Sequence, residues 1–232
     1  MHVCTQQPER YPGAPIGNYV PHNEASVEQL LEVMDANQVE KTILVQPTPY
    51  GWDNRYLLDA QQSHPDRLRA VCLVDPFSPD NGNEITRLAR QHGAAGFRVN
   101  WNLHLLDAWA NSPEHAVFWH TAEELGCPVC IQCTPEFFAL VGTTSREHPA
   151  VRVVIDHLGR INAEEGLSAP AFQNLLALAG IPNVSVKISG WYYCSQQEPP
   201  FINVHSLAAA IIQAFGAERC MWGSDFPFIQ ER

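Results

Sequence analysis

Positive charge is scarce in this 232-residue sequence, which has 14 Lys and Arg against 25 Asp and Glu and a formal net charge of −11. A sequence without a run of basic residues offers little to nucleic acid or to an anionic membrane. No apolar run approaches the roughly 20 residues that a membrane-spanning helix needs. Residues 1–6 lack the basic start and apolar core of a secretory leader. We therefore expect a cytoplasmic protein that binds a small molecule, and a homo-oligomer is compatible with this composition.

The sequence has seven cysteines, an odd number that argues against a disulfide framework and fits a reducing compartment. Cys127, Cys130 and Cys133 are spaced closely enough to suggest a metal site, but the residues around them are typical of a strand. Three strand residues span about 10 Å, whereas a zinc knuckle needs a turn between its ligands. We expect these cysteines to be packing residues, one of them facing the interior of the fold.

Short apolar stretches alternate with helical patterns along the whole chain. Ser26 and Gln29 form a capping box at the start of one helix, and Ser112 followed by Pro113 marks the start of another. Further helices are predicted at 53–64, 83–92, 135–147, 168–179 and 203–215. The strands between them are predicted to end near residues 47, 75, 100, 133, 157, 189 and 225.

Strict alternation of strands and helices predicts a parallel sheet in one α/β domain covering residues 1–232. With one more strand before Ser26 the count reaches eight, which predicts a (β/α)8 TIM barrel. A doubly wound open sheet is the alternative, but it would want a Gly-rich phosphate loop after its first strand, and the sequence has none. Only residues 1–4 are available for the first strand, and only seven residues follow Asp225. We therefore expect a barrel that is cut short at both ends.

Polar residues recur where the predicted strands end, and catalytic residues of such barrels lie at these ends. They are His2, Gln46, Asp75, Arg98, Gln132, His157, Lys187 and Asp225. Those that point inward would converge on one mouth of the barrel, where they could contact a substrate.

Each of these residues also has a plainer interpretation. Gln46 and Asp75 precede prolines and would cap loops. An Arg in an apolar strand needs an anionic partner, so Arg98 would pair with Asp75 or Asp156, and Lys187 would be a similar structural charge.

His157 and Asp225 are the strongest candidates for an active site, because they end two separate strands. Taken alone, Asp225 would cap a helix and His157 would be held in a turn. A carboxylate at the end of a buried strand is costly, however, unless it is paired or used.

Several motifs resemble those of the amidohydrolase superfamily, and within it the amidohydrolase-2 branch. They occur in order over nearly the whole chain, at 64–67 (HPDR) with 74–76 (VDP), 96–98 (GFR), 154–159 (VIDHLG), 186–190 (VKISG) and 221–227 (MWGSDFP). The resemblance implies a TIM-barrel enzyme of a branch that holds lactonases for sugar lactones and pyrone dicarboxylate, together with decarboxylases.

Two departures from the family pattern concern metal binding. The family's first strand carries His-x-His, and His2 resembles the second of this pair, while the first is absent from the sequence. Metal-using members usually have a His on the fifth strand. This chain has Gln132 and Cys133 there, a sequence pattern typical of the lactonase branch. No cofactor is then required. The alternative is one divalent metal, Zn, bound by His2, His157 and Asp225.

The resemblance implies that Asp225 activates water to open a lactone or ester bond of a small, carboxylated substrate. His157 and His2 would hydrogen-bond the carbonyl oxygen. Arg98 and Lys187 would hold the substrate carboxylate, with Gln46 and Gln132 as further substrate contacts. A zinc-dependent decarboxylase of the same fold and an inactive, truncated barrel remain as alternatives.

Overall fold

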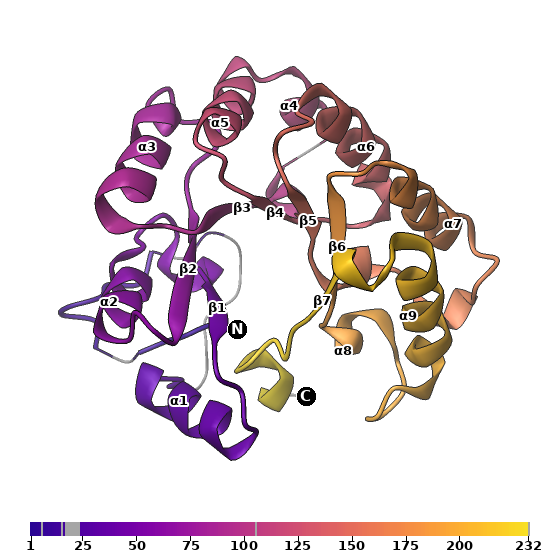
Figure 1. Ribbon diagram of the computed structural model, residues 1–232, viewed down its shortest axis with the longest axis horizontal. Helices are drawn as coiled ribbons and strands as arrows, with labels where there is room; N and C mark the ends of the chain where they lie inside the picture. The colour runs from indigo at the N-terminus through magenta and orange to yellow at the C-terminus, as the bar shows by residue number, and fades with distance from the viewer. Residues whose placement is uncertain (6, 15, 17–23, 105, 232) are drawn as a thin grey trace.

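In the computed structural model, which describes residues 1–5, 7–14, 16, 24–104 and 106–231, the strands form one curled parallel sheet surrounded by helices (Figure 1). All pairings between neighbouring strands are parallel, and the order in space follows the order in sequence. The strands are β1 (Thr42–Val45), β2 (Leu68–Leu73), β3 (Gly96–Asn100), β4 (Val129–Gln132), β5 (Val153–Ile155), β6 (Val184–Ile188) and β7 (Cys220–Trp222).

The helices lie on the outside of this sheet (Figure 1). They are α1 (Val27–Ala36), α2 (Arg55–Ser63), α3 (Asn81–His92), α4 (Leu106–Asn111), α5 (Pro113–Glu124), α6 (Phe138–Glu147), α7 (Pro170–Ala177), α8 (Trp191–Cys194) and α9 (Ile202–Phe215). The strictly sequential strand order supports a TIM-barrel-like fold and excludes the doubly wound sheet, whose strand order reverses at a switch point.

Local sequence explains where helices begin. Ser26 accepts from the Gln29 amide, and the Gln29 side chain accepts from the Ser26 amide, so the predicted capping box is present. Ser112 caps α5 with Pro113 at its first position, also as predicted. The short helices α4 and α8 were not predicted, because six and four residues give too few turns for a helical pattern to be read.

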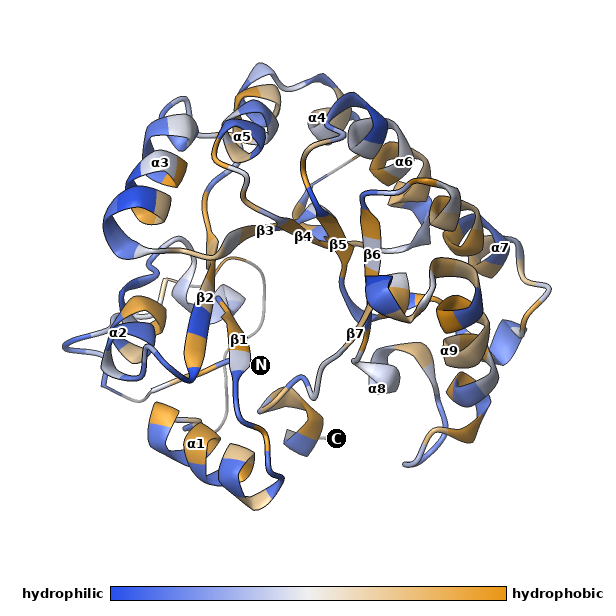
Figure 2. Cartoon of the chain, in the orientation of Figure 1, coloured by the Kyte–Doolittle hydropathy of each residue, from blue (hydrophilic) through white to orange (hydrophobic). Residues whose placement is uncertain are grey.

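The strands are apolar, and the helices turn apolar faces toward them and polar faces outward (Figure 2). The large hydrophobic core lies between sheet and helices, while a second, smaller cluster forms inside the curl of the sheet. This inner cluster consists of Val45, Val71, Cys130 and Val154. None of the described helices is long and apolar enough to cross a membrane.

The described residues contain seven strands in the sheet rather than the eight expected. Residues 1–4 form no strand, but they bridge the two edges of the sheet. The Met1 amine donates to the Ile43 carbonyl at 3.2 Å, and the Val45 amide donates to the Met1 carbonyl at 2.8 Å. The His2 amide donates to the Phe226 carbonyl at 2.8 Å. These bonds bring His2 beside the segment that follows β7; the barrel cut short at both ends stays a prediction.

Candidate active site

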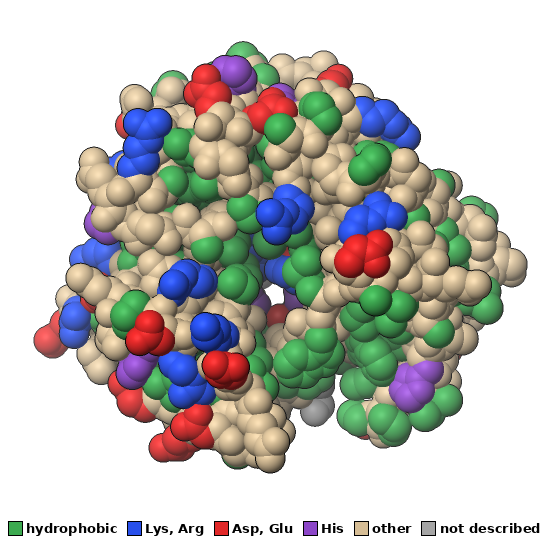
Figure 3. Space-filling model, in the orientation of Figure 1, with side chains coloured by type: hydrophobic (Ala, Val, Ile, Leu, Met, Phe, Trp, Pro, Cys, Tyr) green, Lys and Arg blue, Asp and Glu red, His purple; other side chains and the backbone are tan. Residues whose placement is uncertain are grey.

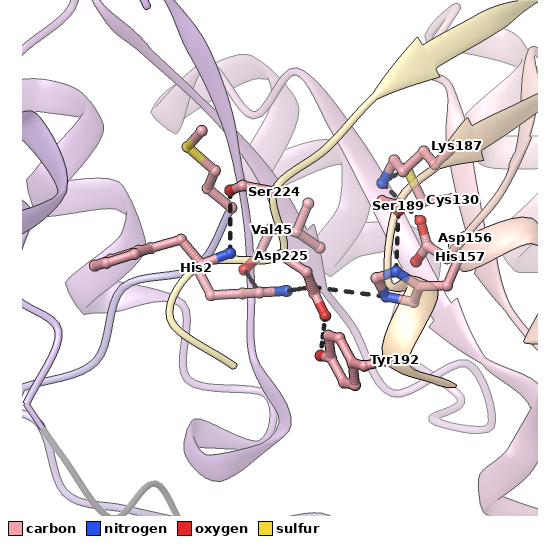
Figure 4. A network of polar contacts seen from close by, with 12 residues as sticks. His2, Val45, Cys130, Asp156, His157, Lys187, Ser189, Tyr192, Ser224 and Asp225 are labelled. Carbon is pink, nitrogen blue, oxygen red and sulfur yellow. Dashed lines mark hydrogen bonds and ion pairs between the residues drawn. The ribbon is translucent and has the colours of Figure 1, made fainter. Parts of the chain in front are cut away.

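Asp225 lies at the centre of a cluster of polar side chains (Figure 4). Its Oδ1 is 3.1 Å from Nε2 of His2 and 3.7 Å from Nε2 of His157. Its Oδ2 accepts a hydrogen bond from the Tyr192 hydroxyl. His2, His157 and Asp225 are each at most 5% exposed. The two groups that the sequence placed at separate strand ends, an imidazole and a carboxylate, therefore share one site.

The backbone at both groups adopts an uncommon conformation. His157 begins a short 3₁₀ segment, His157–Arg160, in which every residue has a positive φ. Asp225 has φ +58°. Non-glycine residues rarely adopt this left-handed region, and such strain tends to occur at functional sites.

Burial and charge set the protonation of the cluster. Burial lowers the pKa of His157 to about 4, with Asp225 opposing the shift, so that this ring is neutral near pH 7. Burial alone would raise the pKa of Asp225, but the hydrogen bond from His2 and the nearby His157 lower it on balance. Asp225 is therefore a carboxylate that can accept a proton.

His2 faces an oxygen on each side of its ring. Nδ1 lies 2.6 Å from the Val45 carbonyl oxygen, and Nε2 faces Asp225. Burial lowers the pKa of His2, although contact with Asp225 opposes that shift. A neutral imidazole donates from one nitrogen only. When Nδ1 donates to the Val45 carbonyl, Nε2 has no proton to donate to Asp225, so both hydrogen bonds form only when His2 and Asp225 together hold one additional proton.

A second buried cluster lies close by. Asp156 Oδ2 is 2.9 Å from Nε of Arg98, and its Oδ1 is 2.6 Å from Nζ of Lys187. Lys187 Nζ is also 3.4 Å from Sγ of Cys130. Burial would raise the pKa of Asp156, but Lys187 and Arg98 lower it well below its usual range. Arg98 thus has the structural ion pair that the plainer interpretation expected, with Asp156 and not Asp75 as its partner.

A cavity of about 700 Å³ connects the two clusters. His2, His157, Asp225, Arg98 and Lys187 all line it. It extends along the inside of the sheet to residues near the strand starts, and a hollow rimmed by basic side chains is visible at the centre of the face in Figure 3.

Residues 1–232 match the family model described as Amidohydrolase. The chain belongs to the amidohydrolase family. The protein is 30% identical to an L-fucono-1,5-lactonase of Burkholderia ambifaria over 86% of this chain and 69% of that protein. It is 26% identical to a 4-sulfomuconolactone hydrolase of Hydrogenophaga intermedia over 94% of this chain and 70% of that one.

A solved structure supports the same assignment. The structure of a probable 2-pyrone-4,6-dicarboxylic acid hydrolase of Acinetobacter baumannii, with citric acid bound, superimposes with a TM-score of 0.85 at 28% identity. It covers 99% of this chain and 83% of that chain. This amidohydrolase is thus a hydrolase with relatives that act on carbon–oxygen bonds of lactones.

Other residues predicted from the sequence lie outside the cluster of this amidohydrolase. Gln46 is buried and donates to the Asp53 carbonyl at 2.7 Å, and Asp75 accepts from the Phe77 amide at 3.0 Å, so both stabilise loops. Gln132 is buried. Neither Gln46 nor Gln132 is among the described residues that line the cavity, so their substrate contacts stay predictions.

The cysteines behave as packing residues. Cys127 and Cys133 are buried in the main core, and Cys130 is in the inner cluster, as expected.

Sequence reasoning missed two contacts that complete the site. The pattern of polar strand ends assigns no role to Tyr192 or to Ser189, whose Oγ lies 3.0 Å from Nδ1 of His157. A signal was present in the order of residues, since Ser189 directly follows β6 and Tyr192 lies in the short helix α8 that comes next, at the mouth of the barrel.

The zinc site that the sequence offers as an alternative, with His2, His157 and Asp225 as ligands, stays a prediction. Among the described residues, no group of three or more His, Cys, Asp or Glu side chains is placed to hold a metal ion. Nε2 of His2 is directed at Asp225 Oδ1 as a hydrogen bond, and Tyr192 covers Oδ2.

Proposed function

We propose that this amidohydrolase opens the lactone ring of a small substrate that carries a carboxylate. The observation that supports this most is the placement of His2 and His157 around one oxygen of Asp225, on a cavity that Arg98 and Lys187 also line. The names of the relatives point to lactones as the substrate class.

Asp225 is the general base in this proposal. It takes a proton from a water molecule, whose oxygen attacks the lactone carbonyl carbon. The bond between that carbon and the ring oxygen then breaks, and the proton passes from Asp225 to the leaving oxygen. One lactone and one water give one hydroxy acid.

His157 is best suited to hold the carbonyl oxygen as negative charge develops on it. With the Ser189 hydroxyl donating to Nδ1, the ring proton is on Nε2. Nε2 lies 3.7 Å from Oδ1 of Asp225, too far for a hydrogen bond, and is therefore available to a substrate oxygen in the cavity that His157 lines. The same role for His2 finds less support, because both of its ring nitrogens already face protein oxygens. We assign His2 to holding Asp225 and sharing its proton.

The carboxylate of the substrate is assigned to Arg98 and Lys187. In the buried cluster two cations, Arg98 and Lys187, face the single carboxylate of Asp156. The resulting excess of positive charge favours binding of an additional anion. Because both cations already contact Asp156, a substrate carboxylate would join this cluster as a second acceptor.

A hydrolysis screen tests the function. The purified protein is assayed with carboxylated lactones and sugar 1,5-lactones, with and without added zinc or chelator. Asp225→Asn is expected to lower turnover by at least about 100-fold. Asp35→Asn is the matched control, since that carboxylate is 66% exposed and, unlike its partner Arg67, is not among the described residues that line the cavity.

Three outcomes would contradict the proposal. Near-full activity of Asp225→Asn removes Asp225 from the mechanism. Release of carbon dioxide with a zinc requirement indicates the decarboxylase. No turnover of any lactone by the wild-type protein favours an inactive barrel.

A further inference from the structure

One short segment, residues 189–194, contacts both His157 and Asp225. Ser189 Oγ is 3.0 Å from Nδ1 of His157, and Cys194 Sγ donates to the His157 carbonyl at 3.6 Å. The Tyr192 hydroxyl donates to Oδ2 of Asp225. Figure 4 shows Ser189 beside His157 and Tyr192 beside Asp225, so that one segment contacts the two central groups of the site.

Gly190 allows the segment to lie this close. It has φ +60°, and a Cβ at this position would lie 2.5 Å from Nδ1 of His157. A side chain there would displace the ring, so the approach of α8 to His157 depends on glycine. The chain then turns directly into α8, which begins at Trp191 and places Tyr192 over the carboxylate.

Tyr192 acts on the oxygen of Asp225 that no histidine contacts in the described site. Oδ1 is near both His2 and His157, whereas the hydrogen bond to Oδ2 comes from Tyr192. The carboxylate is a terminal group whose rotation about its last side-chain bond is weakly restricted. A donor on each oxygen fixes that rotation.

We propose that Tyr192 is a positioning residue for the reaction. Its hydroxyl holds Oδ2 of Asp225 and thereby keeps Oδ1 aligned with His2 and with the water to be activated. The proposal rests on the lactone-hydrolase function above, because it assigns Tyr192 a role in presenting the base of that reaction.

The plainer explanation is that Asp225 only satisfies a buried hydroxyl. Tyr192 is 8% exposed, and a buried hydroxyl needs a partner. The two explanations differ in what loss of the hydroxyl does to the rate. A structural hydroxyl affects stability, whereas a positioning hydroxyl affects turnover of bound substrate.

Tyr192→Phe separates these explanations. Misplacing a catalytic group by about 1 Å can cost on the order of 100-fold, so kcat is expected to fall about 10- to 100-fold. KM should stay within about twofold, because Tyr192 is not among the described residues that line the cavity. Tyr192→Ala should lower kcat to a similar extent, since the hydroxyl is lost in both variants.

Tyr50→Phe is the matched control. Tyr50 is as buried as Tyr192, and its hydroxyl accepts from the Thr5 amide at 2.6 Å and donates to the Thr5 carbonyl at 3.1 Å, outside the active site. This variant should keep kcat within about twofold while losing stability. A Tyr192→Phe enzyme with unchanged kcat would overturn the proposal.

Crystal structures of the wild type and of Tyr192→Phe supply a readout that does not depend on activity. The variant is expected to show the Asp225 carboxylate rotated or in more than one conformer, with its contact to His2 lengthened or lost. An unmoved carboxylate contradicts the positioning role. If the wild type hydrolyses no lactone, the proposed function fails, and these structures still decide whether Tyr192 positions Asp225.

Discussion

Asp156→Asn should cause a large loss of stability. The Asp156 side chain is 2% exposed and sits between the side chains of Arg98 and Lys187, which are 5% and 16% exposed. Removing one partner from a buried ionic cluster typically costs about 3–5 kcal/mol, because the remaining charge is left buried without compensation. Here two cations would remain beside each other. We expect a loss near the lower end of this range, about 3 kcal/mol, because Lys187 can release its proton once Asp156 no longer stabilises its charge.

The assay is equilibrium unfolding in urea at pH 7. With a slope of about 2–3 kcal/mol per M, the expected loss lowers the unfolding midpoint by about 1–1.5 M. The control is Asp35→Asn, whose exposed ion pair with Arg67 should contribute less than about 1 kcal/mol.

The pH dependence provides a second check on the same prediction. The pKa of Asp156 is lowered in the folded protein, because Lys187 and Arg98 outweigh its burial. Its contribution to stability is therefore fully present above the unfolded-state pKa of about 3.9 and is lost as pH falls below that value toward the lower folded-state pKa. The wild type should lose stability more steeply than Asp156→Asn below about pH 4. If Asp156→Asn costs no more than Asp35→Asn and the two acid profiles coincide, the ionic cluster does not stabilise the fold as reasoned.

Two further predictions concern the surroundings of the site and the cysteines. Gly190→Ala should destabilise the protein by about 1–2 kcal/mol, because alanine is strained at φ +60°. It should also lower kcat at least about tenfold by displacing His157. The control is Gly180→Ala, whose added Cβ would meet no atom within 4 Å, and equal effects of the two substitutions would refute the steric argument. Ellman's reagent should modify about one thiol per native chain, because six of the seven cysteines are buried and burial raises the pKa of Cys72 and Cys194 to about 12. Cys220→Ser should remove this fast reaction, and a fast phase that persists would show that another thiol is accessible.

Periodic patterns made most of the fold predictable. Each of the seven strands is a short apolar run with a polar end, and the long helices have clear starts such as Ser26 and Ser112. The convergence of His157 and Asp225 followed from the strand ends of a parallel sheet. The bridging of the two sheet edges by residues 1–4 could not be predicted. These residues contact β1 and Phe226 through backbone hydrogen bonds, which leave no pattern in the side chains.

Which residues belong to the site was easier to predict than which of them contact one another. An apolar strand that contains Arg98 predicts an anion nearby but not which one. Arg98 on β3 pairs with Asp156, which follows β5 two strands away, and not with Asp75, which follows the adjacent β2. The contact of Tyr192 with Asp225 depends on the left-handed backbone at Gly190 and Asp225, and no residue pattern reveals such a conformation at an aspartate.

The hydrogen bond between His2 and Asp225 joins residues 223 positions apart. Closing a loop of that length costs on the order of 5 kcal/mol in chain entropy, so this contact forms late in folding. On the ribosome, which adds about 5–20 residues per second, β1 to β6 emerge seconds before Asp225 does. Under the proposed function, a nascent chain that has assembled those strands already holds His157, Arg98 and Lys187 but lacks Asp225, and the onset of turnover would mark the moment when the segment that carries Asp225 docks.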